Sequence, residues 1–158
     1  MLLIAHRGNI RGPDENKENH PDYLVAAIGA GYNVELDIWK VGESLALGHD
    51  SPQYEISKEF LTSLASSTTL WTHAKNIEAL QYMSELKNLN FTKQWNFFWH
   101  EKDSYTLTSE GYIWAYPGSI LTQNSICVMP EAVKGFYSQQ QILACKGVCS
   151  DYVEAYKT

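Results

Sequence analysis

The sequence is poor in cysteine, with three in 158 residues, and it has no apolar run of 18 residues. Small secreted domains held together by disulfides use cysteine at a much higher density, so we expect the three thiols to lie reduced in the core. Cys145 and Cys149 have the spacing of a metal half-site, but no matching Cys or His pair lies nearby. A membrane-spanning helix needs about 20 apolar residues. The sequence therefore predicts neither a disulfide framework nor a membrane span.

Positive charge is also scarce. Twelve Lys and Arg residues stand against 18 Asp and Glu residues, for a formal net charge of −6. This balance argues against general binding to nucleic acid or to an anionic membrane surface. The chain begins with an apolar stretch, residues 1–5, that has no basic region or cleavage site around it, so we expect no signal peptide and a cytoplasmic protein.

Three apolar runs in the first fifty residues each contain or lead into polar side chains. The three polar groups are Ala5-His6-Arg7-Gly8, Glu35-Leu36-Asp37 and Gly48-His49-Asp50. Apolar runs this short, bounded by Gly and polar residues, predict buried strands. We therefore expect the polar side chains to lie at strand ends.

Glu35 and Asp37 are two residues apart, so on a strand both carboxylates point to the same face. Two carboxylates that face the same way can share a cation, and oxygen ligands suit Mg²⁺ or Ca²⁺. His6 and His49 can then supply an acid and a base for catalysis.

A surface strand with alternating acids is the alternative explanation of Glu35 and Asp37. The residues between and beside them, Val34, Leu36 and Ile38, make the opposite face of that strand apolar. Polar ends on three strands also favour a site over a surface pattern.

At these residues the sequence resembles the glycerophosphodiester phosphodiesterase family of the PLC-like phosphodiesterase superfamily, whose pattern is His-Arg, then Glu-x-Asp, then His. Glu18-Asn19-His20-Pro21 is similar to the segment that opens the family's first helix. Sphingomyelinase D enzymes have the same motif set. The resemblance implies a metal-dependent phosphodiesterase that cleaves a small glycerophosphodiester-like substrate, with Arg7 and Asn19 binding the phosphodiester.

The resemblance also implies a fold, the (β/α)₈ barrel, which usually needs about 250 residues. At 158 residues the chain is short, so we expect one domain over residues 1–158, a reduced TIM-type (β/α) barrel with some helices lost. Strands expected at 111–118 and 125–131 leave too few residues between them for a crossover helix. A barrel completed by a partner is the alternative, and bare outer strand faces make a homo-oligomer possible.

A second βα unit is expected at strand 70–75 and helix 76–86, from its apolar spacing. The family carries Glu-x-Lys at the strand, where this chain has His73 and Lys75. The resemblance implies that His73 is a metal ligand and that Lys75 binds phosphate, although a structural, hydrogen-bonding histidine stays open. Histidine suits Mn²⁺ or Zn²⁺ better than Ca²⁺, so the expected cofactor is Mg²⁺ or Ca²⁺, or else Mn²⁺ or Zn²⁺.

The later part of the chain adds one candidate residue. Residues 97–103 predict a strand whose alternation places His100 and Lys102 on one face, and we expect His100 to line the substrate site. An amphipathic helix is expected over about 132–143, and residues 147–152 are similar to the family's last strand. The alternative function is a catalytically inactive module that binds a phosphodiester or phosphate.

Overall fold

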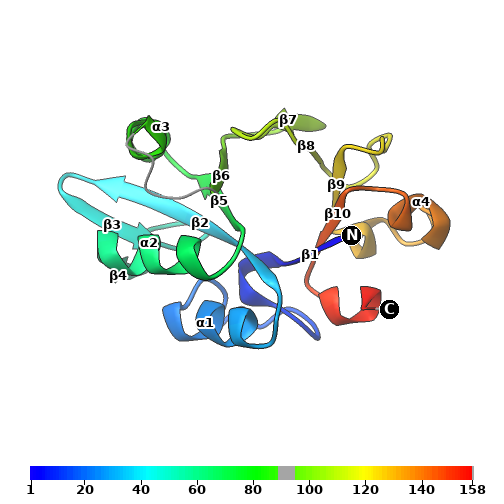
Figure 1. Cartoon of the computed structure of the whole chain (residues 1–158), viewed down its shortest axis with the longest axis horizontal. Helices are drawn as coiled ribbons and strands as arrows, with labels where there is room; N and C mark the ends of the chain where they lie inside the picture. The colour runs from blue at the N-terminus through cyan, green and yellow to red at the C-terminus, as the bar shows by residue number, and fades with distance from the viewer. Residues whose placement is uncertain (89–94, 158) are drawn as a thin grey trace.

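The computed structural model describes residues 1–88 and 95–157, which form an α/β protein built on one mixed, partly parallel sheet. The sheet curls strongly and makes a half-barrel, with the α-helices on its outer side (Figure 1). The strands are β1 (Leu2–Ala5), β2 (Asn33–Val41), β3 (Ser44–Leu47), β4 (Tyr54–Ile56), β5 (Leu70–Ala74), β6 (Trp95–Phe98), β7 (Tyr105–Leu107), β8 (Ile113–Ala115), β9 (Ser125–Val128) and β10 (Gly147–Ser150). The helices are α1 (Pro21–Gly29), α2 (Lys58–Ser67), α3 (Ile77–Asn88) and α4 (Gln139–Leu143), with short 3-10 turns η1 (His6–Gly8), η2 (Pro130–Val133) and η3 (Val153–Tyr156).

A run of parallel strands forms the main part of the sheet, in the order β6-β5-β2-β1-β10-β9-β8. Residues paired in register in a parallel sheet have side chains on the same face. Glu35 pairs with Trp71 and Asp37 with His73, so these four side chains share one face. The end of β2 thus meets the end of β5 with polar groups on both strands.

The hairpin after β2 returns the chain to the same end of the sheet. β2 pairs with β1 only at its start, at Asn33 and Val34, and its last four residues pair with β3 in antiparallel fashion. The backbone N–H of Gly48 then donates to the carbonyl oxygen of Asp37 at 3.2 Å. The loop that carries His49 therefore starts beside Asp37.

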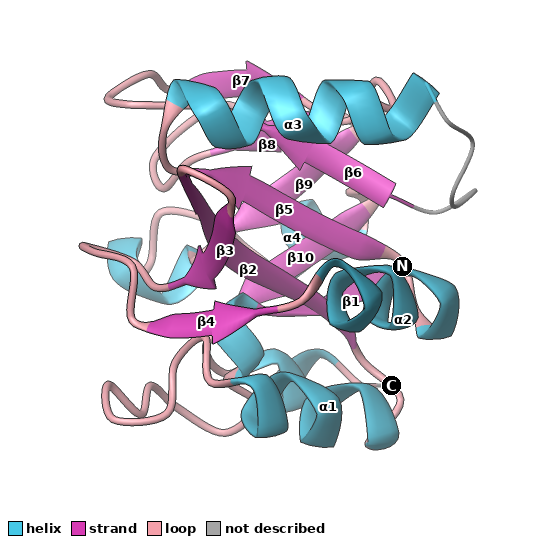
Figure 2. Cartoon of the chain, turned by 90° about the vertical axis from the view of Figure 1, so that its left-hand side faces the viewer, coloured by secondary structure: helices cyan, strands magenta, loops and turns pink. Residues whose placement is uncertain are grey.

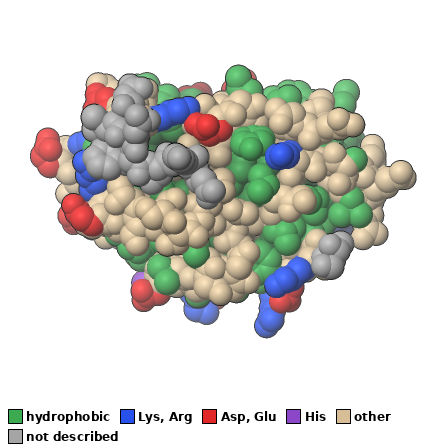
Figure 3. Space-filling view, viewed as in Figure 1, with side chains coloured by type: hydrophobic (Ala, Val, Ile, Leu, Met, Phe, Trp, Pro, Cys, Tyr) green, Lys and Arg blue, Asp and Glu red, His purple; other side chains and the backbone are tan. Residues whose placement is uncertain are grey.

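Two of the three apolar clusters among the described residues lie on opposite faces of the curled sheet. The first packs the sheet against α1, α2 and α3 through residues such as Leu24, Leu61 and Met83. In Figure 2 these helices lie toward the viewer, with α3 at the top and α1 at the bottom. The second lies inside the curl and contains Ile4, Trp71, Phe98, Trp114, Ile126, Val128 and Cys149. Figure 3 shows side chains filling the centre that the ribbon leaves open. The half-barrel therefore has a packed interior.

Several expected elements differ from the structure. The strand expected over 97–103 ends at Phe98, so His100 lies in the loop after β6 and the predicted alternation with Lys102 is wrong. The helix expected over 132–143 is replaced by η2 and the five-residue α4, because Gly135 has φ 79° and Ser138 begins a new helix with a capping box. β8 and β9 pair in parallel, and the residues that connect them, 116–124, contain no helix.

Exposed apolar side chains gather on the outer face of β7 and β8, where no α-helix of the described residues covers the sheet. Tyr105, Leu107, Ile113 and Ile120 line one shallow hollow there, and Leu107 and Ile120 are 68% and 79% exposed. A homo-oligomer stays a prediction. No helix in the described residues is long and apolar enough to cross a membrane, and the three cysteines are buried free thiols.

Gly147 allows β10 to approach β1 and β9 closely. A Cβ at this position would lie 2.9 Å from both Cβ and the carbonyl oxygen of Leu2 and 3.0 Å from Cδ1 of Ile126. We expect Gly147→Ala to lower the free energy of unfolding by about 1–3 kcal/mol, because the strands must shift to admit a methyl group. Urea unfolding measures this change.

The matched control is Gly29→Ala. Gly29 lies in α1, and an added Cβ meets nothing within 4 Å. We expect this variant to be more stable than the wild type by up to about 1 kcal/mol, because alanine favours the helix. Equal stability of Gly147→Ala and the wild type would mean that the strands around Gly147 are packed more loosely than described.

Candidate metal centre

The centre is built from two strands. Glu35 and Asp37 lie on β2 and His73 on β5, and one ligand atom of each lies within 4.8 Å of the others. Glu35 is 3% exposed and Asp37 is fully buried. Two carboxylates and an imidazole at this separation could hold a metal ion.

Asp37 has several polar partners. Its Oδ1 lies 3.1 Å from His73 Nδ1 and 3.5 Å from Lys75 Nζ, and its Oδ2 lies 3.1 Å from Arg7 Nε. Asn19 Nδ2 donates to Oδ2 at 2.9 Å, while the N–H of Asp37 donates to Asn19 Oδ1 at 2.9 Å. The buried carboxylate is therefore compensated by positive charge and hydrogen-bond donors on several sides.

The two carboxyl groups respond to these surroundings in opposite ways. Burial alone would raise the pKa of Asp37, but the hydrogen bond from His73 and the charges of Arg7, His73 and Lys75 hold that pKa far below its usual range. Burial raises the pKa of Glu35, and the neighbouring charge of Asp37 raises it further. Asp37 is thus the group of the pair that keeps its negative charge most firmly.

The turn after β1 aims Arg7 at the centre. Arg7 has φ 52°, a left-handed backbone conformation that is uncommon for a residue with a side chain. Its N–H donates to Glu35 Oε2 at 3.2 Å and its Nη1 donates to Glu18 Oε2 at 2.9 Å. Gly8 follows with φ 90°, and a Cβ there would lie 2.9 Å from the ring of Tyr23. This turn therefore needs glycine after the arginine.

His6 is oriented by an acid from the other end of the chain. His6 Nδ1 and Asp151 Oδ1 are 2.7 Å apart, and since a carboxylate can only accept, the proton of this bond belongs to Nδ1. His6 Nε2 lies 4.0 Å from Glu35 Oε2. Burial lowers the pKa of His6, but the bond to Asp151 and the charge of Glu35 outweigh it, so the pKa is raised. Nε2 is the ring nitrogen left for proton transfer.

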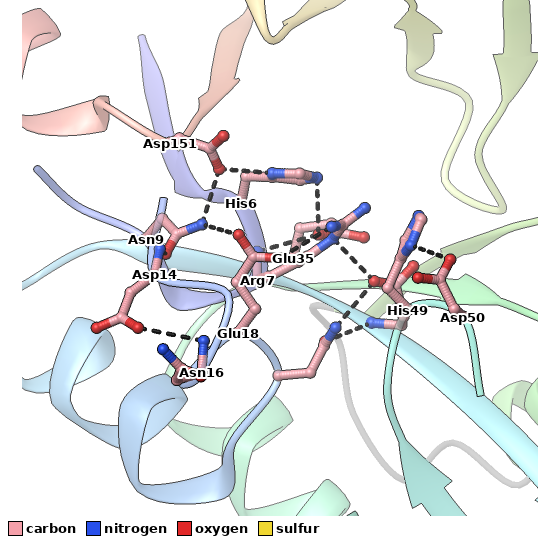
Figure 4. Close-up of polar contacts among 12 residues, drawn as sticks. His6, Arg7, Asn9, Asp14, Asn16, Glu18, Glu35, His49, Asp50 and Asp151 are labelled. Atoms are coloured by element: carbon pink, nitrogen blue, oxygen red, sulfur yellow. Dashed lines mark hydrogen bonds and ion pairs between the residues drawn. The ribbon is translucent and has the colours of Figure 1, made fainter. Parts of the chain in front are cut away.

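A polar pocket of about 510 Å³ lies over the strand ends and is lined by His6, Arg7, Asn19, His49 and Asp151, among others. Figure 4 shows His6 and Arg7 between Asp151 on one side and His49 with Asp50 on the other. His49 Nδ1 lies 2.7 Å from Asp50 Oδ1. Burial and the charge of Arg7 lower the pKa of His49. The two histidines thus reach one pocket from different loops.

His100 contacts His73 and is in this way connected to the metal centre. The two rings have centroids 5.3 Å apart, and His73 Nε2 lies 3.5 Å from the carbonyl oxygen of His100. On its other side the His100 ring stacks on Tyr116 with centroids 3.6 Å apart. Burial and the charge of His73 lower the pKa of His100 to about 4.

The structure therefore brings the nine candidate residues into one region. Four of them line the pocket, and Glu35, Asp37, His73, Lys75 and His100 lie beside it, joined through Arg7, Asn19 and His73. Sequence reasoning did not select Asp151, Glu18 or Tyr116. Glu18 and Asp151 stand in segments that resemble the family, and this resemblance was the signal that could have found them. No signal in the sequence pointed to Tyr116.

No family model, curated protein or solved structure matches this chain. The likeness to the glycerophosphodiester phosphodiesterase family therefore stays a prediction that rests on its motifs.

Proposed function

We propose that the protein is a metal-dependent phosphodiesterase that cleaves a small glycerophosphodiester-like substrate by histidine acid-base catalysis. The observation that carries the proposal is the grouping of Glu35, Asp37 and His73 within 4.8 Å, next to a pocket lined by His6 and His49. We infer further that the half-barrel is a reduced TIM-type (β/α) barrel, which has lost the helices after β6 and β8.

The donor set fits a divalent cation. Glu35 and Asp37 offer the oxygen ligands that suit Mg²⁺ or Ca²⁺, and His73 offers a nitrogen that favours Mn²⁺ or Zn²⁺. When bound, such a cation would supply charge neutralisation for a phosphoryl oxygen.

The chain's own residues supply the remaining steps. Arg7 and Lys75, each partly buried beside Asp37, offer charged N–H donors for phosphate oxygens. His6 exchanges its proton at Nε2, because Nδ1 is bonded to Asp151. His49 does the same at Nε2, because its Nδ1 pairs with Asp50. One histidine takes the proton of the hydroxyl that attacks phosphorus. The other protonates the alkoxide that leaves when the phosphodiester bond breaks.

The alternative, a catalytically inactive phosphate-binding module, is favoured by the contacts of Asp37. Arg7, His73 and Lys75 already compensate Asp37 with their own charges or donors, so the site can hold its carboxylates without a cation. Such a module would bind inorganic phosphate equally well with and without a chelator and would show no turnover.

Asp37→Asn tests the role of the centre. This change keeps the shape of the side chain and removes one negative charge, so Mn²⁺ affinity and phosphodiester turnover should both fall by about 10- to 1000-fold, or about 1.4–4 kcal/mol. Calorimetric titration and a chromogenic phosphodiester, with and without chelator, measure the two quantities.

Glu15→Gln is the control for Asp37→Asn, because Glu15 lines the same pocket but lies outside the ligand group. Glu15→Gln should keep the Mn²⁺ affinity and the turnover of the wild type. Asp37→Asn leaves Arg7 and Lys75 without their carboxylate, so thermal melting must show that the variant is folded. If Asp37→Asn unfolds, Glu35→Gln takes its place in the test. Unchanged turnover in a folded variant would rule out the proposed centre.

His49→Ala separates catalysis from metal binding. The variant keeps every ligand, so Mn²⁺ affinity should stay the same while turnover drops by about 10²- to 10⁴-fold, as expected for a lost acid or base. His20→Ala is the control, because His20 caps α1 outside the pocket. If His49→Ala retains full turnover, His49 has no part in proton transfer.

His73→Glu tests the metal preference. Replacing nitrogen by oxygen should move the ratio of Mn²⁺ or Zn²⁺ affinity to Mg²⁺ or Ca²⁺ affinity toward the latter pair. Competitive metal titration of the wild type and the variant gives this ratio directly. An unchanged ratio would show that His73 is not a ligand.

A further inference from the structure

Three polar atoms inside the half-barrel have no hydrogen-bond partner among the described residues. They are Nε1 of Trp71, Nδ1 of His100 and the hydroxyl oxygen of Tyr116, and all three are buried. The last two belong to rings that lie side by side. Most buried polar atoms in proteins are hydrogen-bonded, so an orphaned pair at one place requires an explanation. The two rings stack at 3.6 Å between centroids and 23° between planes, so each ring restrains the position of the other.

His100 lies beside His73 of β5, and Tyr116 lies beside the inner cluster after β8. Tyr116 stands two residues after Trp114 of β8 and packs with it against the inner cluster, in which the Trp114 ring lies 5.5 Å from that of Trp71. Trp71 is in turn the register partner of Glu35. Burial raises the pKa of Tyr116, and the charge of Glu35 raises it further.

We propose that Tyr116 and His100 form a hydrogen-bonding pair for an oxygen of a bound phosphate group, next to His73 at the centre. This inference rests on the proposed function, and it adds Tyr116 to the substrate-contacting residues. A phosphate has more acceptor oxygens than Arg7 and Lys75 can satisfy while both also engage Asp37. Tyrosine and neutral histidine add donors without adding positive charge beside a cation site.

Tyr116→Phe tests the pair with inorganic phosphate as the probe. The change removes only the hydroxyl group, and calorimetric titration with Mn²⁺ present should show phosphate affinity reduced about 10- to 100-fold, the usual range for a lost hydrogen bond to a charged group. The melting temperature without phosphate should stay equal or rise, because no hydrogen bond of the free protein is lost.

Tyr137→Phe is the matched control. Its hydroxyl donates to the carbonyl oxygen of Ser119 at 2.8 Å, outside the site, so this variant should melt earlier and bind phosphate as the wild type does. His100→Phe keeps an aromatic ring against Tyr116 and should weaken phosphate binding as Tyr116→Phe does. If Tyr116→Phe or His100→Phe binds phosphate with wild-type affinity, the proposed pair is wrong.

The outcomes separate this inference from the proposed function. A wild type that hydrolyses a phosphodiester while Tyr116→Phe keeps full phosphate affinity refutes the inference alone. A wild type that binds phosphate through Tyr116 but shows no chelator-sensitive hydrolysis refutes the phosphodiesterase alone and supports a binding module. A wild type that binds no phosphate refutes the inference, whatever its turnover.

Discussion

Two carboxylates buried on one face of β2 impose the main constraint on this structure. Glu35 and Asp37 are at most 3% exposed, and two like charges about 4 Å apart repel by about 4 kcal/mol even at an effective dielectric constant of 20. Neighbouring elements offset this repulsion by supplying a hydrogen-bond donor or a positive charge. The turn after β1 supplies Arg7, the loop before α1 supplies Asn19, and β5 supplies His73 and Lys75.

The sequence was most informative where a local rule was enough. The two-residue spacing of Glu35 and Asp37 predicts a shared face, and the apolar runs predict polar groups at strand ends. Asp151 could not be selected in this way, because its contact with His6 joins residues 145 positions apart. Tyr116 was missed for a similar reason, since its place beside His100 depends on how far the sheet curls and on a strand that ends at Phe98.

The fold was predictable in its first half and less so afterwards. Helices α1 to α3 each follow strands with clear apolar spacing and cover the outer face of the sheet. From β6 onward the described residues contain only one α-helix, the five-residue α4, so no long apolar spacing marks the elements there. The aromatic side chains Trp71, Phe98 and Trp114 fill the interior.

The balance of charge at the centre bears on what it can hold. Glu35, Asp37, Glu18 and Asp151 carry four negative charges when ionised, and Arg7 and Lys75 carry two positive ones, which leaves two negative charges with neutral histidines. A divalent cation removes that excess, whereas a phosphate anion alone would increase it. Protonation of His6 or Glu35, whose pKa values are both raised, offsets the excess only in part. In the proposed function, the cation would therefore reduce the electrostatic cost of holding a phosphate group at this site.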